Sequence, residues 1–182
     1  PSPSTNYRVA LIGCVSTGKS TLFEAMTCSE HKRAQTGLKR TTMVPMIFHE
    51  TGAQSLAADG ELIVASNKNP DAKCAELEFN GPVMRMADAP ISRNFSVYDI
   101  PGLNDAKTKS AYYDYVNEHF GEFNMVILPV DINSALNTSD EIDIITMVCK
   151  NTVAAMKSNK PVYTIVVANK VDDMVLGENG LP

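Results

Sequence analysis

Apolar and polar residues alternate along the chain in blocks that predict strands and helices in turn. Nearly continuous apolar runs indicate strands covered on both faces, whereas apolar residues at helical spacing, such as Leu22, Phe23 and Met26, indicate helices. The predicted strands are residues 7–12, 42–49, 61–65, 94–100, 123–130 and 161–168. The predicted helices are residues 20–26, a turn or two at 71–78, 109–120 and 139–156.

Strands that alternate with helices predict an α/β fold with a mostly parallel central sheet and helices on both of its faces. We expect the strand at 42–49 at an edge of that sheet, because Pro45 lacks the backbone N–H that an inner strand uses. The length of 182 residues fits one domain. Residues 1–6 are predicted to be a disordered lead-in, and residues 7–182 are predicted to form the domain.

Composition narrows the class of protein without giving a function. Hydrophobic residues make up 44% of the chain, too many for a disordered protein, and 16 Lys+Arg against 21 Asp+Glu give a net charge of −5. That acidic balance argues against a general nucleic-acid binder, so we expect no nucleic-acid partner. The four cysteines form no CxxC pair and no zinc-ligand pattern, so we expect reduced thiols and a cytoplasmic location.

The sequence GCVSTGKS at residues 13–20 matches the phosphate-binding pattern GxxxxGK[ST] and lies between a predicted strand and a predicted helix. The glycines let successive backbone N–H groups turn toward a phosphate, and the start of the helix adds a favourable dipole. Lys19 is expected to reach the β- and γ-phosphates of a nucleotide, and the Ser20 hydroxyl to bind Mg²⁺. The residues expected to line this site are Gly13, Val15, Ser16, Thr17, Gly18, Lys19, Ser20 and Thr21.

The sequence NKVD at residues 169–172 follows the last predicted strand and matches the guanine-recognition pattern NKxD. The Asp172 carboxylate can accept hydrogen bonds from the N1–H and the amino group of guanine, which adenine does not offer. Asn169 is expected to brace the loop, and the aliphatic stem of Lys170 to cover one face of the base. GTP and GDP are therefore the expected ligands.

Two further elements are needed between these motifs, one for the metal and one for the γ-phosphate. The sequence DIPG at residues 99–102 fits DxxG, in which Asp99 would hold Mg²⁺ through a water and the Gly102 N–H would sense the γ-phosphate. A switch threonine that covers Mg²⁺ is expected near the strand at 42–49. We favour Thr42 over Thr41, with Thr36 as a third candidate.

With these residues assembled, the chain resembles the G domain of the P-loop GTPases, and within that class it looks most like the dynamin-related large GTPases. Three features carry the closer resemblance: the GxxSxGKS form of the phosphate loop with Ser16, the DxPG form at Asp99, and the stretch NSALNTSDEI at residues 133–142. The resemblance implies hydrolysis of GTP with Mg²⁺, a nucleotide-dependent homodimer, and a location that is cytoplasmic or peripheral to a membrane.

The chain also departs from the pattern of its relatives. Dynamins usually have threonine at the position of Asn169 and a catalytic glutamine at that of Val15, and Ras-like proteins have a glutamine where Leu103 stands. The fifth guanine-binding element of the family should lie beyond NKVD. Because the sequence ends ten residues after Asp172, we expect an incomplete G domain that lacks this element and the last part of the sheet.

Without either glutamine, we expect the attacking water to be positioned by the backbone at Thr42 and Gly102, with slow basal turnover. Together with Lys19 and Ser16, these two residues form the expected catalytic set. The resemblance implies that K⁺ or Na⁺ held by Ser16 replaces an arginine finger; Lys39 or Arg40 is an alternative source of positive charge.

Three hypotheses stay open at this point. The chain is a hydrolysing GTPase switch or dynamin-like enzyme, a GTP-binding module with negligible turnover that works by dimerisation or partner binding, or a P-loop ATPase or kinase whose NKVD sequence is accidental. Nucleotide selectivity separates the third hypothesis from the first two. Turnover with and without K⁺ separates the first two from each other.

Overall fold

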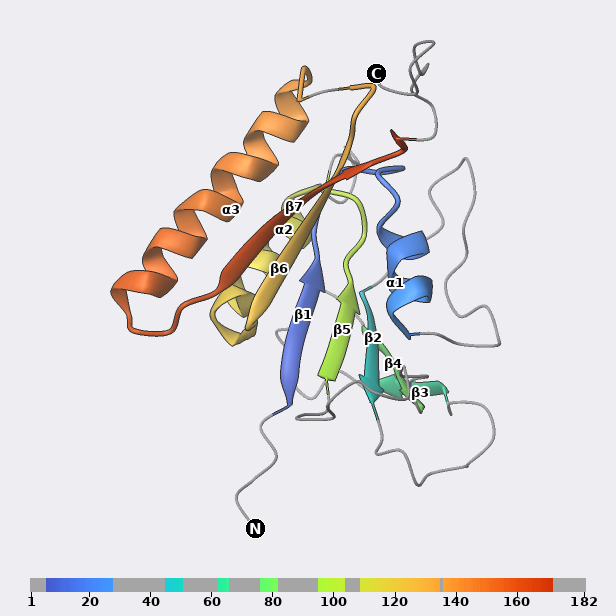
Figure 1. The fold of residues 1–182 in the computed structure, drawn as a ribbon. Coiled ribbons are helices and arrows are strands. Elements are labelled where there is room, and N and C mark those ends of the chain that lie inside the picture. The colour runs from blue at the N-terminus through green and yellow to red at the C-terminus, as the bar shows by residue number, and fades with distance from the viewer. Residues whose placement is uncertain are drawn as a thin grey trace, which may run out of the picture.

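The computed structural model has a seven-stranded sheet at its centre, and it describes residues 6–27, 45–50, 62–65, 76–81, 95–103, 109–134 and 136–171 (Figure 1). The strands are β1 (Tyr7–Leu11), β2 (Met46–Glu50), β3 (Leu62–Ala65), β4 (Glu76–Gly81), β5 (Phe95–Asp99), β6 (Met125–Asp131) and β7 (Tyr163–Asn169). The helices are α1 (Lys19–Thr27), α2 (Lys109–His119), the short 3-10 helix η1 (Phe120–Glu122) and α3 (Ser139–Lys157).

The strand order is β3-β4-β2-β5-β1-β6-β7, and most neighbouring strands run parallel. β1 lies between β5 and β6 and is parallel to both, and β7 is parallel to β6. The antiparallel pairs are β2 with β5 and β3 with β4. The mostly parallel sheet predicted from the sequence is therefore confirmed, and the carboxyl ends of β1, β5, β6 and β7 meet at one edge.

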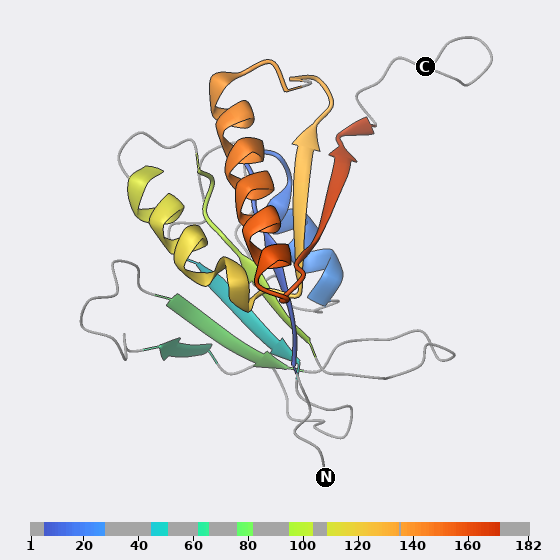
Figure 2. The same cartoon turned by 90° about the vertical axis from the view of Figure 1, so that its left-hand side faces the viewer.

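Helices lie on both faces of the sheet, as predicted: α1 on one face, and α2 and α3 on the other (Figure 2). On the first face, Phe23 of α1 is fully buried with Leu11 and Val97 of the strands. On the second face, Val116 of α2 and Val148 of α3 are buried in a larger cluster. Within the described part of the chain, no helix has the length and apolar character needed to cross a membrane.

Two predictions about the strands near the middle of the chain were wrong. The segment around Pro45 was expected at an edge, but β2 lies inside the sheet between β4 and β5. Pro45 comes just before the first residue of β2, where its missing N–H removes no bond of the ladder. A helical turn or two was expected at residues 71–78, but residues 76–78 belong to β4, which pairs with β2; residues 71–75 lie outside the described residues.

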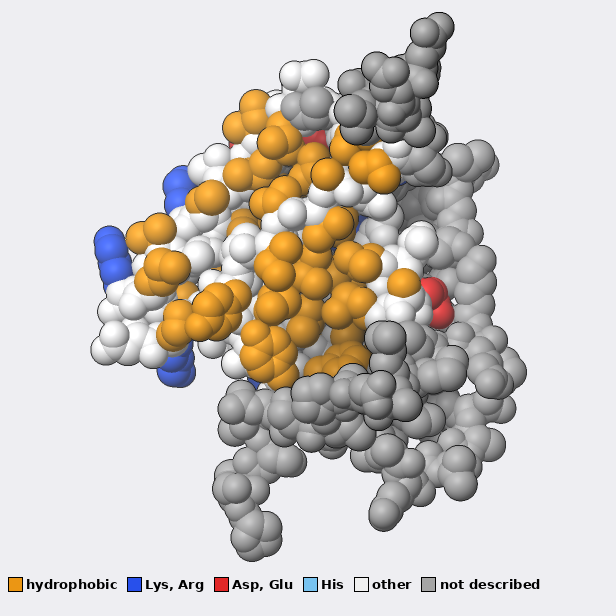
Figure 3. All heavy atoms as spheres, in the orientation of Figure 1, with side chains coloured by type: hydrophobic (Ala, Val, Ile, Leu, Met, Phe, Trp, Pro, Cys, Tyr) orange, Lys and Arg blue, Asp and Glu red, His pale blue; other side chains and the backbone are white. Residues whose placement is uncertain are grey.

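The last strand, β7, was predicted to be buried on both faces, and this too was wrong. β7 is an edge strand that pairs only with β6 among the described residues, and most of its side chains are exposed. Tyr163 is 63% exposed and Val166 60% exposed. Apolar side chains accordingly gather on the sheet face seen in Figure 3. Among the described residues, β7 has a neighbouring strand on one side only, and few side chains pack over its two faces.

Candidate functional site

The loop between β1 and α1, residues 12–18, curls tightly at the carboxyl edge of the sheet. Ser16 and Gly18 both have left-handed backbone, with φ of 64° and 92°. The φ of Gly18 disfavours any residue with a side chain, and a Cβ there would also displace the side-chain amide of Asn169. A Cβ at Gly13 would lie 3.2 Å from both Pro129 O and Thr17 Oγ1. The glycines of the predicted phosphate loop therefore stand where space and conformation require them.

Lys19 begins α1 and is buried at the base of this loop, with 6% of its surface exposed. Its ammonium donates hydrogen bonds to the carbonyl oxygens of Cys14 at 2.6 Å and Gly13 at 3.2 Å. Burial lowers the pKa of Lys19 to about 8, and the negative charge of Asp99 partly opposes that shift. The loop therefore holds a lysine whose charge is stabilised only in part, and a phosphate anion would stabilise it further.

Ser20 and Asp99 bring two oxygen atoms together beside Lys19. The Ser20 hydroxyl donates to Asp99 Oδ2 at 2.7 Å, although the two residues are 79 positions apart in sequence. Asp99 is fully buried at the end of β5. A hydroxyl and a carboxylate at this spacing are the hard oxygen donors that Mg²⁺ prefers, so these residues fit a magnesium site that phosphate oxygens and water would complete.

The turn after β5 lies directly against the phosphate loop. The backbone N–H of Leu103 donates to Gly13 O at 3.2 Å. A Cβ at Gly102 would collide with Val15 and would come within 2.7 Å of its backbone nitrogen, so the two backbones touch only because residue 102 is glycine. The predicted γ-phosphate sensor thus contacts the loop predicted to hold that phosphate.

The end of β7 reaches the same loop from the other side. The side-chain amide of Asn169 donates to the backbone oxygen of Thr17 at 2.8 Å, a contact that joins residues 152 positions apart. Lys170 follows with left-handed backbone, φ 62°, and its ammonium lies 2.6 Å from Asp131 Oδ2. The structure therefore places Asn169 against the phosphate loop, and Lys170, the next residue of NKVD, against Asp131 at the end of β6.

The remaining predicted residues divide into two groups. Val15 is half-buried, and Ser16 and Thr21 are exposed at the start of α1 and in the loop before it. Asp172 and Thr42, with its alternatives Thr41 and Thr36, lie outside the described residues. Their expected roles stay predictions.

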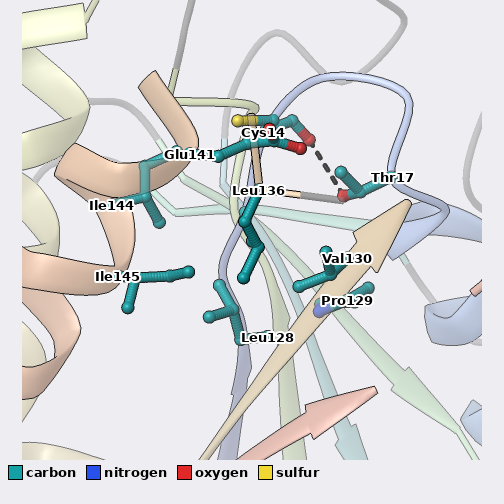
Figure 4. A pocket seen from close by; sticks show the side chains of 10 residues that line it. Cys14, Thr17, Leu128, Pro129, Val130, Leu136, Glu141, Ile144 and Ile145 are labelled. Carbon is teal, nitrogen blue, oxygen red and sulfur yellow. Dashed lines mark hydrogen bonds between the residues drawn. The ribbon is translucent and has the colours of Figure 1, made fainter. Parts of the chain in front are cut away.

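A narrow pocket lies behind the phosphate loop, between β6 and α3 (Figure 4). Cys14 and Glu141 point toward each other at its upper end, and the Thr17 hydroxyl donates to Cys14 O at 3.0 Å. Burial, together with the nearby charge of Glu141, raises the pKa of the Cys14 thiol to about 11. This thiol stays protonated at neutral pH and is a packing group of the loop.

Sequence reasoning missed a polar network that joins β6 to the start of α3. Glu141 closes a capping box with Thr138, whose hydroxyl accepts from the Glu141 N–H at 3.2 Å. The Ser134 hydroxyl donates to Glu141 Oε1 at 2.5 Å and lies 3.0 Å from Asp131 O. The spacing Thr138-x-x-Glu141 is a readable capping signal, and Asp131 could have been found as the charged end of an otherwise apolar strand.

Comparison with known proteins agrees with this geometry. A family model described as 50S ribosome-binding GTPase matches residues 8–170. Two solved structures of an oligomerised bacterial dynamin pair, described as a mechanism for long-range sensing and tethering of membranes, superpose with a TM-score of 0.56 each. They are 17% and 16% identical to this chain, and each match covers 94% of it. It covers 26% and 27% of those chains, so the present chain spans about a quarter of their length.

A third solved structure, the FeoB G-domain from Methanococcus jannaschii, is 17% identical with a TM-score of 0.44, and the match covers 92% of this chain and 69% of that one. A search of curated proteins gives no significant match. The likeness to the dynamin pair, at this level of identity, concerns the fold.

Proposed function

The chain belongs to the family of 50S ribosome-binding GTPases, with a GTP-binding G domain, and on that premise we propose that it binds GTP together with Mg²⁺ and hydrolyses it to GDP and phosphate. The observation that carries the proposal is the hydrogen bond from Asn169 to Thr17, because it joins the guanine motif to the phosphate loop. A single nucleotide could then contact both motifs, with its base near Lys170 and its phosphates near Lys19.

The proposal assigns a role to Lys19, to the curled backbone of the phosphate loop and to the residues beside it. The Lys19 ammonium would exchange its carbonyl partners for β- and γ-phosphate oxygens, while the curled backbone donates N–H groups to the same phosphates. Ser20 and Asp99 would hold Mg²⁺, which supplies positive charge to the phosphates when bound. Gly102 would sense the γ-phosphate through its N–H, next to Val15.

Slow turnover is part of the proposal. Val15 and Leu103 occupy the positions where the resemblance places a water-orienting glutamine, and Leu103 is fully buried. The backbone of Gly102 and of Thr42 would then orient the attacking water. K⁺ or Na⁺ near Ser16, or a second copy of the chain in a nucleotide-dependent homodimer, would supply the missing charge.

The proposal is tested first by nucleotide selectivity. We expect the chain to bind GDP and GTP at least about 100-fold more tightly than ADP and ATP, because Asp172 pairs with groups that only guanine has. Asp172→Asn should shift the preference toward xanthine nucleotides, measured with fluorescent nucleotides in direct titrations. Asp173→Asn is the matched control, since it removes the neighbouring carboxylate and should leave the preference unchanged. Equal binding of ATP and GTP by the wild-type chain would contradict the proposal.

Phosphate release then tests hydrolysis. Turnover should require Mg²⁺ and should rise with K⁺ or with protein concentration if a cation or a second copy supplies charge. Selective GTP binding with no measurable phosphate release under any of these conditions would instead favour a GTP-binding module that works without hydrolysis.

A further inference from the structure

Asp131, at the end of β6, belongs to none of the phosphate-loop, DxxG and NKxD motifs, yet its side chain contacts Lys170 of the guanine loop. Asp131 is the last residue of β6 and pairs in register with Asn169, the last residue of β7. The backbone N–H of Ile132 donates to Asn169 O at 3.2 Å, so the two strand ends stay joined beyond the ladder. The side chain of Asp131 is therefore placed beside the first residues of the guanine loop.

Asp131 uses both of its carboxylate oxygens. Oδ2 lies 2.6 Å from the Lys170 ammonium, and Oδ1 accepts from the Asn133 N–H at 2.9 Å. The side chains of Asp131 and Lys170 are 19% and 35% exposed, so their pair is partly sheltered from solvent. The bond from Lys170, followed by that from Asn133, lowers the pKa of Asp131 below its usual range. The carboxylate is ionised at neutral pH and oriented from two sides.

The backbone of Lys170 adopts an unfavourable conformation. Its φ of 62° lies in the left-handed region, which costs free energy for a residue with a side chain. The ion pair fixes the far end of the side chain while the aliphatic stem stays available to cover a base. Lys170 stands two residues before Asp172 in the sequence, so the guanine motif continues directly from this turn.

Asp131 is itself held by the start of α3. The Ser134 hydroxyl lies between Asp131 O and Glu141 Oε1, and Glu141 is fixed by its capping box with Thr138. The contacts thus run without a break from the first turn of α3 to the guanine loop. These contacts restrain the backbone of Asp131, whose side chain pairs with Lys170.

We propose that Asp131 is a positioning residue for guanine recognition, which holds Lys170 in its left-handed turn and thereby fixes the loop that carries Asp172. The inference rests on the proposed function, because it assigns Asp131 to the same nucleotide site. It predicts an effect on binding of the base and none on binding of the phosphates.

The test is a double-mutant cycle with Asp131→Asn and Lys170→Met. The first substitution keeps the shape and one acceptor, and the second keeps the stem but removes the charge. Each should raise the Kd for GDP by about three- to tenfold, and the double variant should be no worse than either, because both remove one interaction. Asp143→Asn is the matched control: it removes a carboxylate of α3 that lies 3.4 Å from the ammonium of Lys109 on α2, and it should leave the Kd unchanged.

Two further measurements separate positioning from damage to the fold. The first is binding of inorganic triphosphate, which uses the phosphate loop alone and should be the same in the wild type and all four variants. The second is the melting temperature, which in the two single variants and the double variant should agree with that of Asp143→Asn. An unchanged Kd for GDP in Asp131→Asn, additive effects in the cycle, or an equal loss of triphosphate binding would overturn the inference. If the wild-type chain itself fails to prefer guanine nucleotides, the proposed function falls, and the inference falls with it.

Discussion

The pKa of Lys19 leads to a pH dependence of nucleotide affinity that can be worked out from the structure. In the unliganded chain this pKa is lowered from 10.5 to about 8, chiefly by burial. Lys19 would then be about nine-tenths protonated at pH 7.0 and about one quarter protonated at pH 8.5. Bound phosphates raise the pKa again, since a nearby anion favours the ammonium, so the complex keeps its proton over this range.

The direction of the pH effect follows from the protonation of Lys19 in the free and the nucleotide-bound chain. Above pH 8 the unliganded lysine has lost a proton that the complex must regain, so binding takes up a proton and weakens as the pH rises. Between pH 7.0 and 8.5 the Kd for GDP should increase about fourfold, which corresponds to about 0.8 kcal/mol. The range ends at pH 8.5 so that the guanine base keeps its own N1 proton.

The assay is a series of GDP titrations at constant ionic strength and constant free Mg²⁺. Lys19→Arg is the control, because a guanidinium stays charged throughout this range and its affinity, although weaker, should not change with pH. A flat profile for the wild-type chain would show that Lys19 is fully protonated before the nucleotide arrives. The same fourfold change in Lys19→Arg would assign the titration to another group. Either result would refute the reasoning.

Two further predictions concern packing and helix capping. Gly102→Ala should destabilise the fold by about 1–3 kcal/mol in urea unfolding, because the new Cβ collides with Val15, while Gly121→Ala, which meets nothing within 4 Å, should not. A stable Gly102→Ala variant with normal GDP binding would contradict the close contact described here. Thr138→Ala should cost about 1 kcal/mol through loss of the cap on α3, whereas Thr138→Ser should retain the cap, and equal stability of the two variants would count against it.

The sequence predicted the fold class and the position of the phosphate loop because both depend on local patterns. The run from β1 through GCVSTGKS into α1 combines a strand, two glycines in required places and a helix start within about 20 residues. DIPG and NKVD follow β5 and β7, and the carboxyl ends of parallel strands lie at one edge of a sheet, so both motifs reach the edge that holds the phosphate loop. The contact of Asn169 with Thr17 is the outcome of that rule.

What the sequence did not predict depends on neighbours far along the chain. The sequence around Asp131 does not indicate whether its carboxylate faces solvent or a lysine 39 residues away. The ion pair of Asp131 with Lys170 forms because β6 and β7 end in register. Likewise, Pro45 argues for an edge when it is taken as part of a strand. One residue before the strand, a proline does not argue for an edge position. The first residue of a strand cannot be determined that accurately from sequence.

The failure at β7 has a different origin. Its sequence, YTIVVAN, has apolar side chains at positions that face both ways, which is the pattern of a strand covered on both faces. In the structure, Ile165 pairs beside Ile127 on the face that carries α1, yet Ile165 is 43% exposed while Ile127 is 8% exposed. Val166, on the opposite face, is more exposed still. The apolar pattern therefore identified side chains that favour burial. The described part of the chain, however, does not cover them. A hydrophobic pattern shows which side chains favour burial. Which element covers them can be found only from the tertiary structure.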